Sequence, residues 1–394
     1  MQKQEVVILG AARTPMGNLL GSLKDVPAVV LGKVALEAAM ARAQMPFEKI
    51  EEVIMGCVLS AGVGQAPARQ VALRAGLLPS TDCTTVNKMC GSGMKAVMLA
   101  CQAIQLGEHQ VVAAGGIESM SNAPYLLPKA RAGLRLGHTP LLDHLFYDGL
   151  EDAYDKGRLM GTYAEQCAQH YQFSREAQDQ FAMTSLLRAK EATQSGAFAA
   201  EIAPVTVVTK EGEVTIKTDE QPLKAKPEKI PLLKPAFSKE GTITAANSSS
   251  ISDGAACLIL ASSAAAAAHN HTPLARIVGY ATHSQAPEWF TTAPVAAMKK
   301  LLRQLDWQVE DVDLFEINEA FAVVAMAGMA ELNIPHEKLN IHGGACALGH
   351  PIGASGARIL VTLLYALQQK KLKRGIAALC IGGGEATALA VERV

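Results

Sequence analysis

The stretch Asn87-Lys-Met-Cys-Gly-Ser-Gly-Met-Lys-Ala96 opens a long Ala-rich segment and is followed by the apolar run Val111-Val-Ala-Ala-Gly-Gly116. The same succession returns later as Gly353-Ala-Ser-Gly-Ala-Arg358, an Ala- and Leu-rich segment, and Ala377-Ala-Leu-Cys-Ile-Gly-Gly-Gly384. Each copy ends in a further apolar run of similar character. Two copies of one α/β unit explain this repetition, and they lie much farther apart than the period of solenoid repeats.

Around the two copies, short β-branched runs alternate with longer helical stretches, which predicts an α/β fold. We assign residues 1–121 plus 242–270 to the first copy and 271–394 to the second. The intervening residues 122–241 are richer in Pro, Lys, Gly and Tyr and contain a helical stretch at Tyr163–Gln194. Because so long an insertion in a compact domain is usually functional, we expect a loop domain that covers the site.

The composition excludes several classes of function. The formal net charge is −1, so nothing global attracts the chain to nucleic acid or to an anionic membrane. No apolar run reaches the ~18–20 residues of a membrane-spanning helix. Only Met1 to Gln4 precede the first apolar strand, so we expect no signal peptide and a cytoplasmic protein. The 8 cysteines form no cluster at zinc spacing and no nucleotide fingerprint is visible, so neither a metal nor a cofactor is predicted.

Two residues near the repeated glycine clusters are candidates for nucleophile and base. Cys90 precedes a helix, whose N-terminus favours a thiolate, although a packed structural thiol explains the residue equally well. His350 lies in a glycine-rich loop before the second helix, and histidine is the base best matched to neutral pH. The alternative is a loop histidine used only for hydrogen bonding. Because the two sites are equivalent in the repeat, pseudo-twofold symmetry predicts that they meet.

Two more candidates follow strands of the second copy. Cys380 ends a buried strand before three glycines, so its sulfur can point from a rigid element into a site. Asn318 directly follows the strand Leu314–Ile317 and precedes a helix expected at Ala320–Leu332. It is either the N-cap of that helix or an amide that holds a water or an oxyanion.

Four separated motifs resemble those of the thiolase family, namely Asn87-Lys-Met-Cys-Gly-Ser-Gly93, Asn318-Glu-Ala-Phe-Ala322, Gly349-His-Pro351 and Cys380-Ile-Gly382. The resemblance covers nearly the whole chain. It implies the duplicated five-layered α-β-α-β-α thiolase fold with an inserted loop domain. It also implies a homotetramer built from tight dimers.

The resemblance further implies a reversible condensation of two acetyl-CoA to acetoacetyl-CoA plus CoA. His350 would activate Cys90, which carries the acetyl group, and Cys380 would exchange the α-proton of the second acetyl-CoA. One oxyanion hole would be His350 with a water held by Asn318, and the other the backbone N–H groups of Cys90 and Gly382. The expected partners are thus acetyl-CoA, acetoacetyl-CoA and CoA.

The family positions that bind CoA fall at five residues of this chain: Met160, Phe237, Ser249, Ala320 and Phe321. The chain departs from many biosynthetic thiolases at Leu159, where they carry His, and at Leu223, where they carry Arg. Five lysines of the insertion either serve the CoA phosphates or belong to a solvated loop: Lys224, Lys226, Lys229, Lys234 and Lys239.

Three other functions are compatible with parts of this pattern. A thiolase for longer 3-oxoacyl-CoA chains of fatty-acid degradation shares the catalytic motifs, but Leu159-Met-Gly161 and Trp289-Phe-Thr-Thr-Ala-Pro294 favour the acetyl-specific branch. A decarboxylating ketoacyl synthase shares the fold and a nucleophilic cysteine, and Cys380 argues against it. A non-catalytic lipid or acyl-CoA carrier would lack catalytic residues that this chain retains.

Overall fold

The repeated unit of the sequence forms the same strand order twice. The computed structural model describes residues 4–268 and 270–394. The strand order is β1-β10-β5-β3-β4 in one half and β11-β14-β13-β12 in the other. In both halves the first three strands are antiparallel and the next one is parallel to its neighbour. The strands are β1 (Val6–Arg13), β3 (Glu52–Gly56), β4 (Asp82–Val86), β5 (Val111–Ser119), β10 (Ser252–Ser262), β11 (Ala275–Ser284), β12 (Leu314–Ile317), β13 (Arg374–Ile381) and β14 (Glu385–Glu392).

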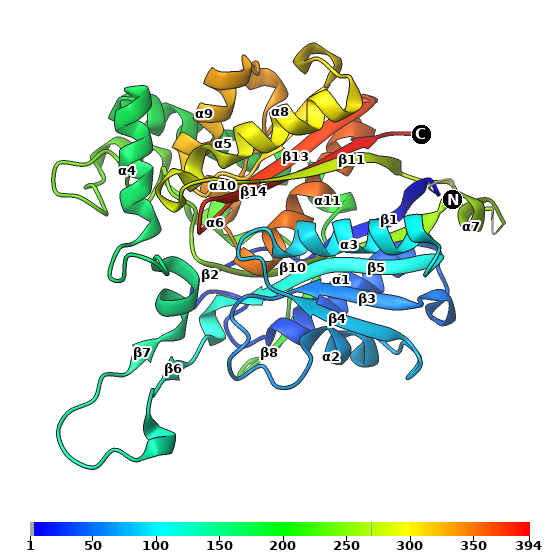
Figure 1. The fold of residues 1–394 in the computed structure, drawn as a ribbon, viewed down its shortest axis with the longest axis horizontal. Helices are drawn as coiled ribbons and strands as arrows, with labels where there is room; N and C mark the ends of the chain where they lie inside the picture. The colour runs from blue at the N-terminus through cyan, green and yellow to red at the C-terminus, as the bar shows by residue number, and fades with distance from the viewer. Residues whose placement is uncertain (1–3, 269) are drawn as a thin grey trace.

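The two halves join where β1 pairs with β11 through only two residue pairs, and helices fill the layers on either side (Figure 1). Helices α1 and α2 cover the outer face of the first half, and α8 and α9 cover the outer face of the second. Helices α3 and α11 lie between the halves. The predicted five-layered α-β-α-β-α fold is therefore confirmed. The helices are α1 (Ala28–Ala43), α2 (Pro67–Arg74), α3 (Ser92–Leu106), α8 (Ala293–Leu305), α9 (Ala322–Leu332) and α11 (Ile352–Lys370).

Small residues let the two central helices approach closely. A Cβ on Gly93 of α3 would lie 2.9 Å from the backbone nitrogen of Ala357, and one on Gly356 of α11 would lie 2.5 Å from that of Met94. Larger side chains would therefore force the helices apart. Because these contacts fall in the first turns of both helices, the residues just before them, Cys90 and His350, are brought to the same region, as the repeat predicts.

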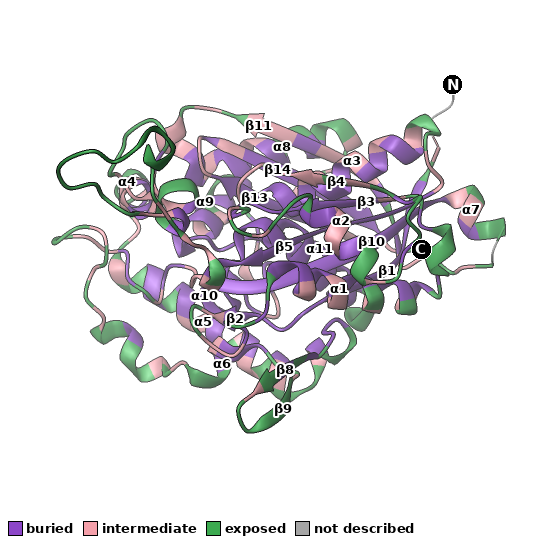
Figure 2. Ribbon diagram, turned by 90° about the horizontal axis from the view of Figure 1, so that it is seen from below, coloured by how far each residue is buried: buried purple, intermediate pink, exposed green. Residues whose placement is uncertain are grey.

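The buried core follows this layering. One apolar cluster lies in the central layer, between α3, α11 and both sets of strands, and two others lie beneath the outer helices. Figure 2 shows the central strands and α11 as almost wholly buried, whereas exposed residues gather on the outer helices and the insertion. Within the part of the chain that the structure describes, no helix is both long and apolar enough to cross a membrane.

The insertion between β5 and β10 contains a projecting arm and a helical part. The arm is the lower-left excursion of Figure 1 around β6 and β7. The helical stretch expected at Tyr163–Gln194 consists of two helices, because α4 ends where Gln172 adopts a left-handed φ of 56° and Ser174 caps α5 by accepting the N–H of Ala177. The remaining helices and strands are β2 (Gly17–Asn18), β6 (Tyr125–Leu126), β7 (Leu142–Asp143), α4 (Met160–Tyr171), α5 (Arg175–Gln194), β8 (Val205–Thr209), β9 (Gly212–Ile216), α6 (Glu220–Lys224), α7 (Ser263–Ala268) and α10 (Ala345–Leu348).

Candidate active site

Cys90 lies in a strained turn between β4 and α3. The preceding residue, Met89, has a φ of 46°, a conformation that costs a non-glycine residue free energy and often marks a functional site. Ser92 holds the turn, because its hydroxyl accepts the N–H of Lys88 at 2.8 Å and donates to the carbonyl of Met89 at 2.6 Å. The position of the sulfur is thus set by the backbone.

The thiol of Cys90 is not a preformed thiolate. Burial raises the pKa of Cys90 to about 11, although the backbone N–H groups of Gly382 and of Cys90 itself act in the opposite direction. The N–H groups favour the thiolate, as expected at a helix N-terminus, but desolvation of the charged form has the larger effect on the pKa of Cys90. These two N–H groups nevertheless lie beside the sulfur, where the oxyanion hole was predicted.

Cys380 is the penultimate residue of β13 and lies close to the Cys90 turn. It is fully buried, and burial raises its pKa well above the ordinary value, with the charge of Cys90 as the second cause. Gly91 allows this approach, because a Cβ there would lie 2.4 Å from Cδ1 of Ile381. Lys88 reinforces it through an ion pair of 2.6 Å with Glu385 across the two halves. The structure thus brings the two predicted cysteines together.

His350 lies in the loop before α11 with one ring nitrogen occupied and the other free. Its Nδ1 is 2.6 Å from the hydroxyl of Ser355, and that hydroxyl donates to the carbonyl of Pro351 at 2.9 Å. The hydroxyl therefore accepts from Nδ1–H, which leaves the lone pair on Nε2. Nε2 is buried and has no hydrogen-bond partner among the described residues. Burial, with the charge of Arg358, lowers the pKa of His350 to about 3, so the ring is a neutral base.

Asn318 faces His350 rather than capping a helix. Its Nδ2 lies 3.4 Å from Nδ1 of His350, and its Oδ1 accepts an N–H of Arg358 at 3.4 Å. The N-cap alternative is wrong, because α9 begins at Ala322 and Phe321 occupies the cap position without a side-chain hydrogen bond.

Ser355 and Arg358 were not singled out from the sequence. Both stand in the quoted repeat Gly353-Ala-Ser-Gly-Ala-Arg358, which indicated only the duplication. Both residues lie in the first two turns of the helix that follows His350, and this spacing could have indicated that they lie near its ring.

The residues matched to CoA binding line one approach to these side chains. The ring of Phe237 packs edge-on against that of Phe321 at 5.9 Å, and the hydroxyl of Ser249 donates to the carbonyl of Ala320 at 3.0 Å. Met160 lies beside Gly382, because a Cβ added to Gly382 would be 3.4 Å from the Sδ of Met160. The structure therefore brings all five residues together beside the cysteines.

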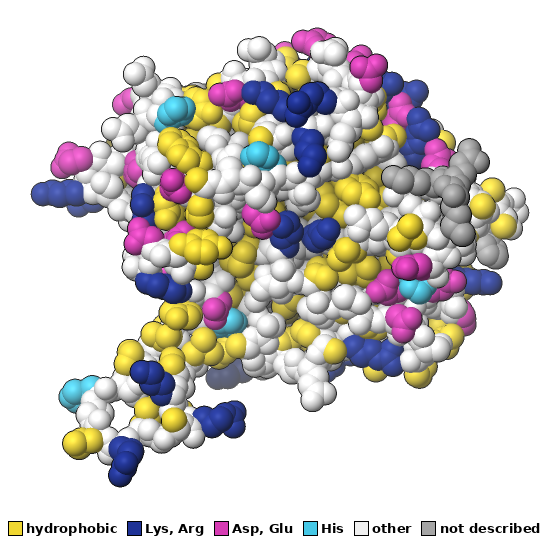
Figure 3. Space-filling view, viewed as in Figure 1, with side chains coloured by type: hydrophobic (Ala, Val, Ile, Leu, Met, Phe, Trp, Pro, Cys, Tyr) yellow, Lys and Arg dark blue, Asp and Glu magenta, His cyan; other side chains and the backbone are white. Residues whose placement is uncertain are grey.

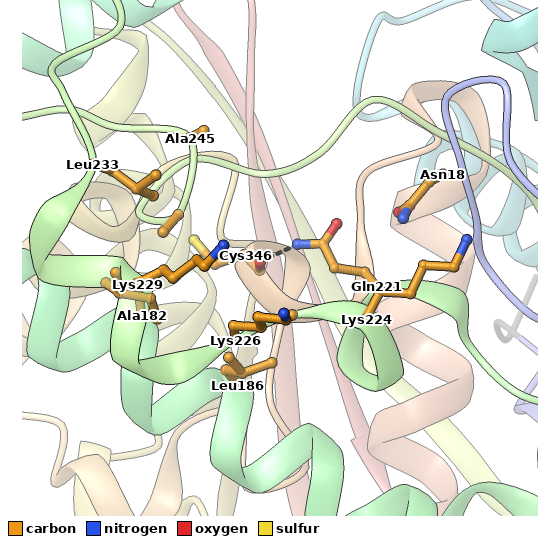
Figure 4. A pocket seen from close by; sticks show the side chains of 13 residues that line it. Asn18, Ala182, Leu186, Gln221, Lys224, Lys226, Lys229, Leu233, Ala245 and Cys346 are labelled. Carbon is orange, nitrogen blue, oxygen red and sulfur yellow. Dashed lines mark hydrogen bonds between the residues drawn. The ribbon is translucent and has the colours of Figure 1, made fainter.

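A cavity of about 450 Å³ lies farther along this side of the insertion (Figure 4). It adjoins Ala246, three residues before Ser249. Its polar side chains are those of Asn18, Gln221, Lys224, Lys226 and Lys229, together with Cys346. Gln221 donates to the carbonyl of Cys346 at 2.8 Å, and Lys224 pairs with Glu220. Lys234, Lys239 and Leu223 do not line this cavity. No group of His, Cys, Asp and Glu suited to a metal ion occurs among the described residues.

Comparison with known proteins identifies the family. Residues 6–264 match the thiolase N-terminal domain and residues 271–393 the thiolase C-terminal domain. A probable acetyl-CoA acetyltransferase of Dictyostelium discoideum is 50% identical over 99% of this chain and 94% of its own length. The acetyl-CoA acetyltransferase of Escherichia coli is 48% identical over 98% and 99%.

Solved structures agree with these relatives. The Acat5 thiolase of Ascaris suum in complex with coenzyme A superposes with a TM-score of 0.94 at 43% identity, covering 99% of this chain and 100% of that one. The acetyl-CoA acetyltransferase of Bacillus anthracis gives 0.97 at 41% identity, with all of both chains covered. The fold brings two thiol groups, an imidazole nitrogen and two backbone N–H groups together at one site. The matches over nearly the whole sequence show that the chain belongs to the thiolase family.

Proposed function

We propose that this protein is an acetyl-CoA C-acetyltransferase that condenses two acetyl-CoA into acetoacetyl-CoA and CoA, or cleaves acetoacetyl-CoA with CoA in reverse. One observation carries the proposal: the N–H of Gly382 lies at the sulfur of Cys90, and Cys380 is so near that a charge on Cys90 raises its pKa. A thiol that holds an acyl group beside a second thiol that exchanges a proton is what this two-step reaction needs. Relatives along the whole chain carry the same activity in their names.

In the first step, Cys90 takes the acetyl group. His350 Nε2 receives the thiol proton as the sulfur attacks the thioester carbonyl of acetyl-CoA, and this proton then leaves with the CoA thiol. Charge on the carbonyl oxygen is stabilised by the N–H groups of Cys90 and Gly382, because these are the donors beside the sulfur. One such donor is typically worth about 3–4 kcal/mol of barrier.

In the second step, Cys380 first passes its thiol proton to Nε2 of His350 and then, as the thiolate, removes the α-proton of another acetyl-CoA. The resulting carbanion attacks acetyl-Cys90, a carbon–carbon bond forms, and the released Cys90 thiolate takes the proton back from His350. The first oxyanion hole is occupied by the acetyl oxygen, so the second thioester oxygen turns towards the Nε2–H of His350 and a water held by Asn318. The reaction transfers protons and an acyl group without a net redox change, so we propose that it needs no metal or redox cofactor.

Thiolysis of 3-oxoacyl-CoA esters of different length tests this proposal. We expect cleavage of acetoacetyl-CoA to be much faster than cleavage of a ten-carbon ester. Equal rates would indicate a thiolase of fatty-acid degradation, and turnover of malonyl thioesters would indicate a decarboxylating synthase. Absence of turnover on every ester would indicate a non-catalytic carrier.

The lysines of the cavity are proposed to hold the phosphate end of CoA. Replacing Lys226 and Lys229 together by alanine is expected to raise the KM for CoA about 10-fold with little change in kcat, since uniform binding of substrate and transition state is lost. The matched control is Lys234→Ala, a lysine of the same segment outside the cavity. A truncated pantetheine thioester, which lacks the phosphates, should react equally well with all variants. A KM for CoA that stays unchanged contradicts the assignment.

We expect kcat/KM for acetyl transfer not to rise with pH through the ordinary pKa of histidine. The pKa of His350 is lowered from 6.5 to about 3, so its base form persists as the pH falls through 6.5. Burial raises the pKa of Glu118 to about 7, and its negative charge above that pH opposes ionisation of Cys90. We therefore expect kcat/KM to stay level or to fall modestly between about pH 5.5 and 7.5. A rise with a midpoint near 6.5 contradicts the assignment of a neutral buried base.

We propose that the protein is a homotetramer. The projecting arm displays apolar side chains together with basic ones (Figure 3). Leu136 is fully exposed, and Tyr125, Leu134 and Leu141 are also exposed. Apolar side chains gathered on an arm that projects from the protein favour a protein partner, here further copies of the chain. Light scattering on the purified protein measures the assembly. The cytoplasmic location and a role in fatty acid metabolism stay predictions.

A further inference from the structure

Arg358 is buried next to the catalytic residues without a full set of partners. It lies on α11, and none of its surface is exposed. Its Nη2 donates to Oδ1 of Asn318 at 3.4 Å, and its Nη1 lies 3.8 Å from a carboxylate oxygen of Glu316. Nε and Nη1 have no hydrogen-bond partner among the described residues. A buried guanidinium with so few partners is costly, so a role beyond the stability of the fold is expected.

Arg13, another buried arginine, has the carboxylate partners that are expected of an arginine that stabilises the fold. Arg13 donates to Glu201 at 2.5 Å and to both carboxylate oxygens of Asp219, at 2.7 and 2.9 Å. Among the residues that the structure describes, Arg358 has one ion-pair partner, Glu316, which is beyond hydrogen-bond distance. Its side chain donates a hydrogen bond to the amide of Asn318 instead.

This contact decides which way the Asn318 amide faces. The oxygen and nitrogen of an asparagine amide can exchange places at almost no steric cost, so a neighbouring group must select one orientation. An N–H donor on Oδ1 turns Nδ2 the other way, to 3.4 Å from Nδ1 of His350, and because Nδ1 carries a hydrogen the two nitrogens do not hydrogen-bond to each other. With the amide reversed, Nδ2 would face the guanidinium as donor against donor, and Oδ1 would lie on the His350 side.

We propose that Arg358 is a positioning residue of the reaction: through Oδ1 of Asn318 it fixes the amide so that its N–H side serves the second thioester oxygen. The inference rests on the proposed function and adds to it. Arg358 touches no reacting atom. The titratable groups around it are Glu316 and Glu319 near the end of β12, Glu201 and Arg13 on the other side of α11, and the neutral His350 before that helix.

The proposal separates the two halves of the reaction. Acetyl transfer to Cys90 uses the N–H groups of Cys90 and Gly382, whereas formation of the carbon–carbon bond also needs the oxygen site beside Asn318. Loss of Arg358 should therefore slow the second half more than the first. A purely structural role would slow both in parallel.

The experiment compares Arg358→Met and Arg358→Gln in the full-length protein. Exchange of label between acetyl-CoA and free CoA reports acetyl transfer alone, and thiolysis of acetoacetyl-CoA reports the carbon–carbon step. For Arg358→Met we expect thiolysis to fall about 10- to 100-fold while exchange changes less than about 3-fold, since a direct oxyanion donor is worth more than a residue that orients one. Arg358→Gln retains an N–H and should recover part of the thiolysis rate.

A double-mutant cycle with Asn318→Ala decides whether the effect passes through that amide. If it does, Arg358→Met costs little further activity once Asn318 is alanine. The control is Arg188→Met, which removes a partly buried arginine that donates to the carbonyls of His336 and Leu339 and should leave the ratio of thiolysis to exchange unchanged. Parallel loss of both rates, or full additivity in the cycle, overturns the proposal. Absence of exchange and thiolysis in the unaltered protein would instead overturn the proposed function.

Discussion

Cys90→Ala is expected to abolish both acetyl exchange and thiolysis of acetoacetyl-CoA, with a loss of about 10⁴-fold or more, because no other group can carry the acetyl intermediate. The fold should persist, since Cys90 is only partly buried and the turn around it is held by Ser92. The measurement is the rate of both reactions together with the mass of the protein after incubation with acetyl-CoA. The unaltered protein should gain the mass of one acetyl group, and the variant should not.

Cys83→Ala is the matched control for this variant. Cys83 is another partly buried thiol, at the strand before the Cys90 turn, and lies outside the site. It should keep both activities. Acetylation of the Cys90→Ala protein on another cysteine, with turnover retained, would contradict the assignment of the nucleophile.

Cys380→Ala is expected to separate the two half-reactions. Without its thiol, no group at the end of β13 can exchange the α-proton, so thiolysis should fall by about 10³-fold or more. Acetylation of Cys90 and exchange of label should continue at a rate within about 10-fold of the unaltered protein, because they depend on His350 and the two backbone N–H groups. An acetyl-enzyme that forms but does not turn over is the diagnostic species.

Cys257→Ala controls for the loss of a buried thiol, because Cys257 is equally buried in β10 but away from the site. It should lower thermal stability without changing the ratio of thiolysis to exchange. If Cys380→Ala lost exchange as completely as thiolysis, the residue would be needed for acetyl transfer and its role as the second proton-transfer group would be wrong.

The local sequence predicted features of the fold correctly where the backbone conformation or a close backbone contact requires particular residue types. The strand β12 has the limits that were expected for it, Leu314–Ile317, because the apolar run there coincides with the burial that the fold requires. The glycines at 93 and 356 were seen as a repeat, and the structure adds their reason, which is the close crossing of α3 and α11.

Two properties of the candidate site could not be decided from the local sequence. Asn318 could be either a cap or a catalytic amide, because both depend on a residue after a strand, and only its distance to His350 separates them. The effect of the helix N-terminus on Cys90 could be expected from the sequence, whereas the larger, opposing effect of desolvation on its pKa could not.

The sequence by itself determined the duplication, the α/β class and the candidates for the reacting side chains, because each follows from a local pattern of residue types. Only the tertiary structure decided which of them act together and in which protonation state. The partners of His350, Asn318 and Cys380 come from different elements, and their pKa values depend on how much protein surrounds them. Burial is a property of the whole packed chain, so it cannot be read from the residues beside each side chain.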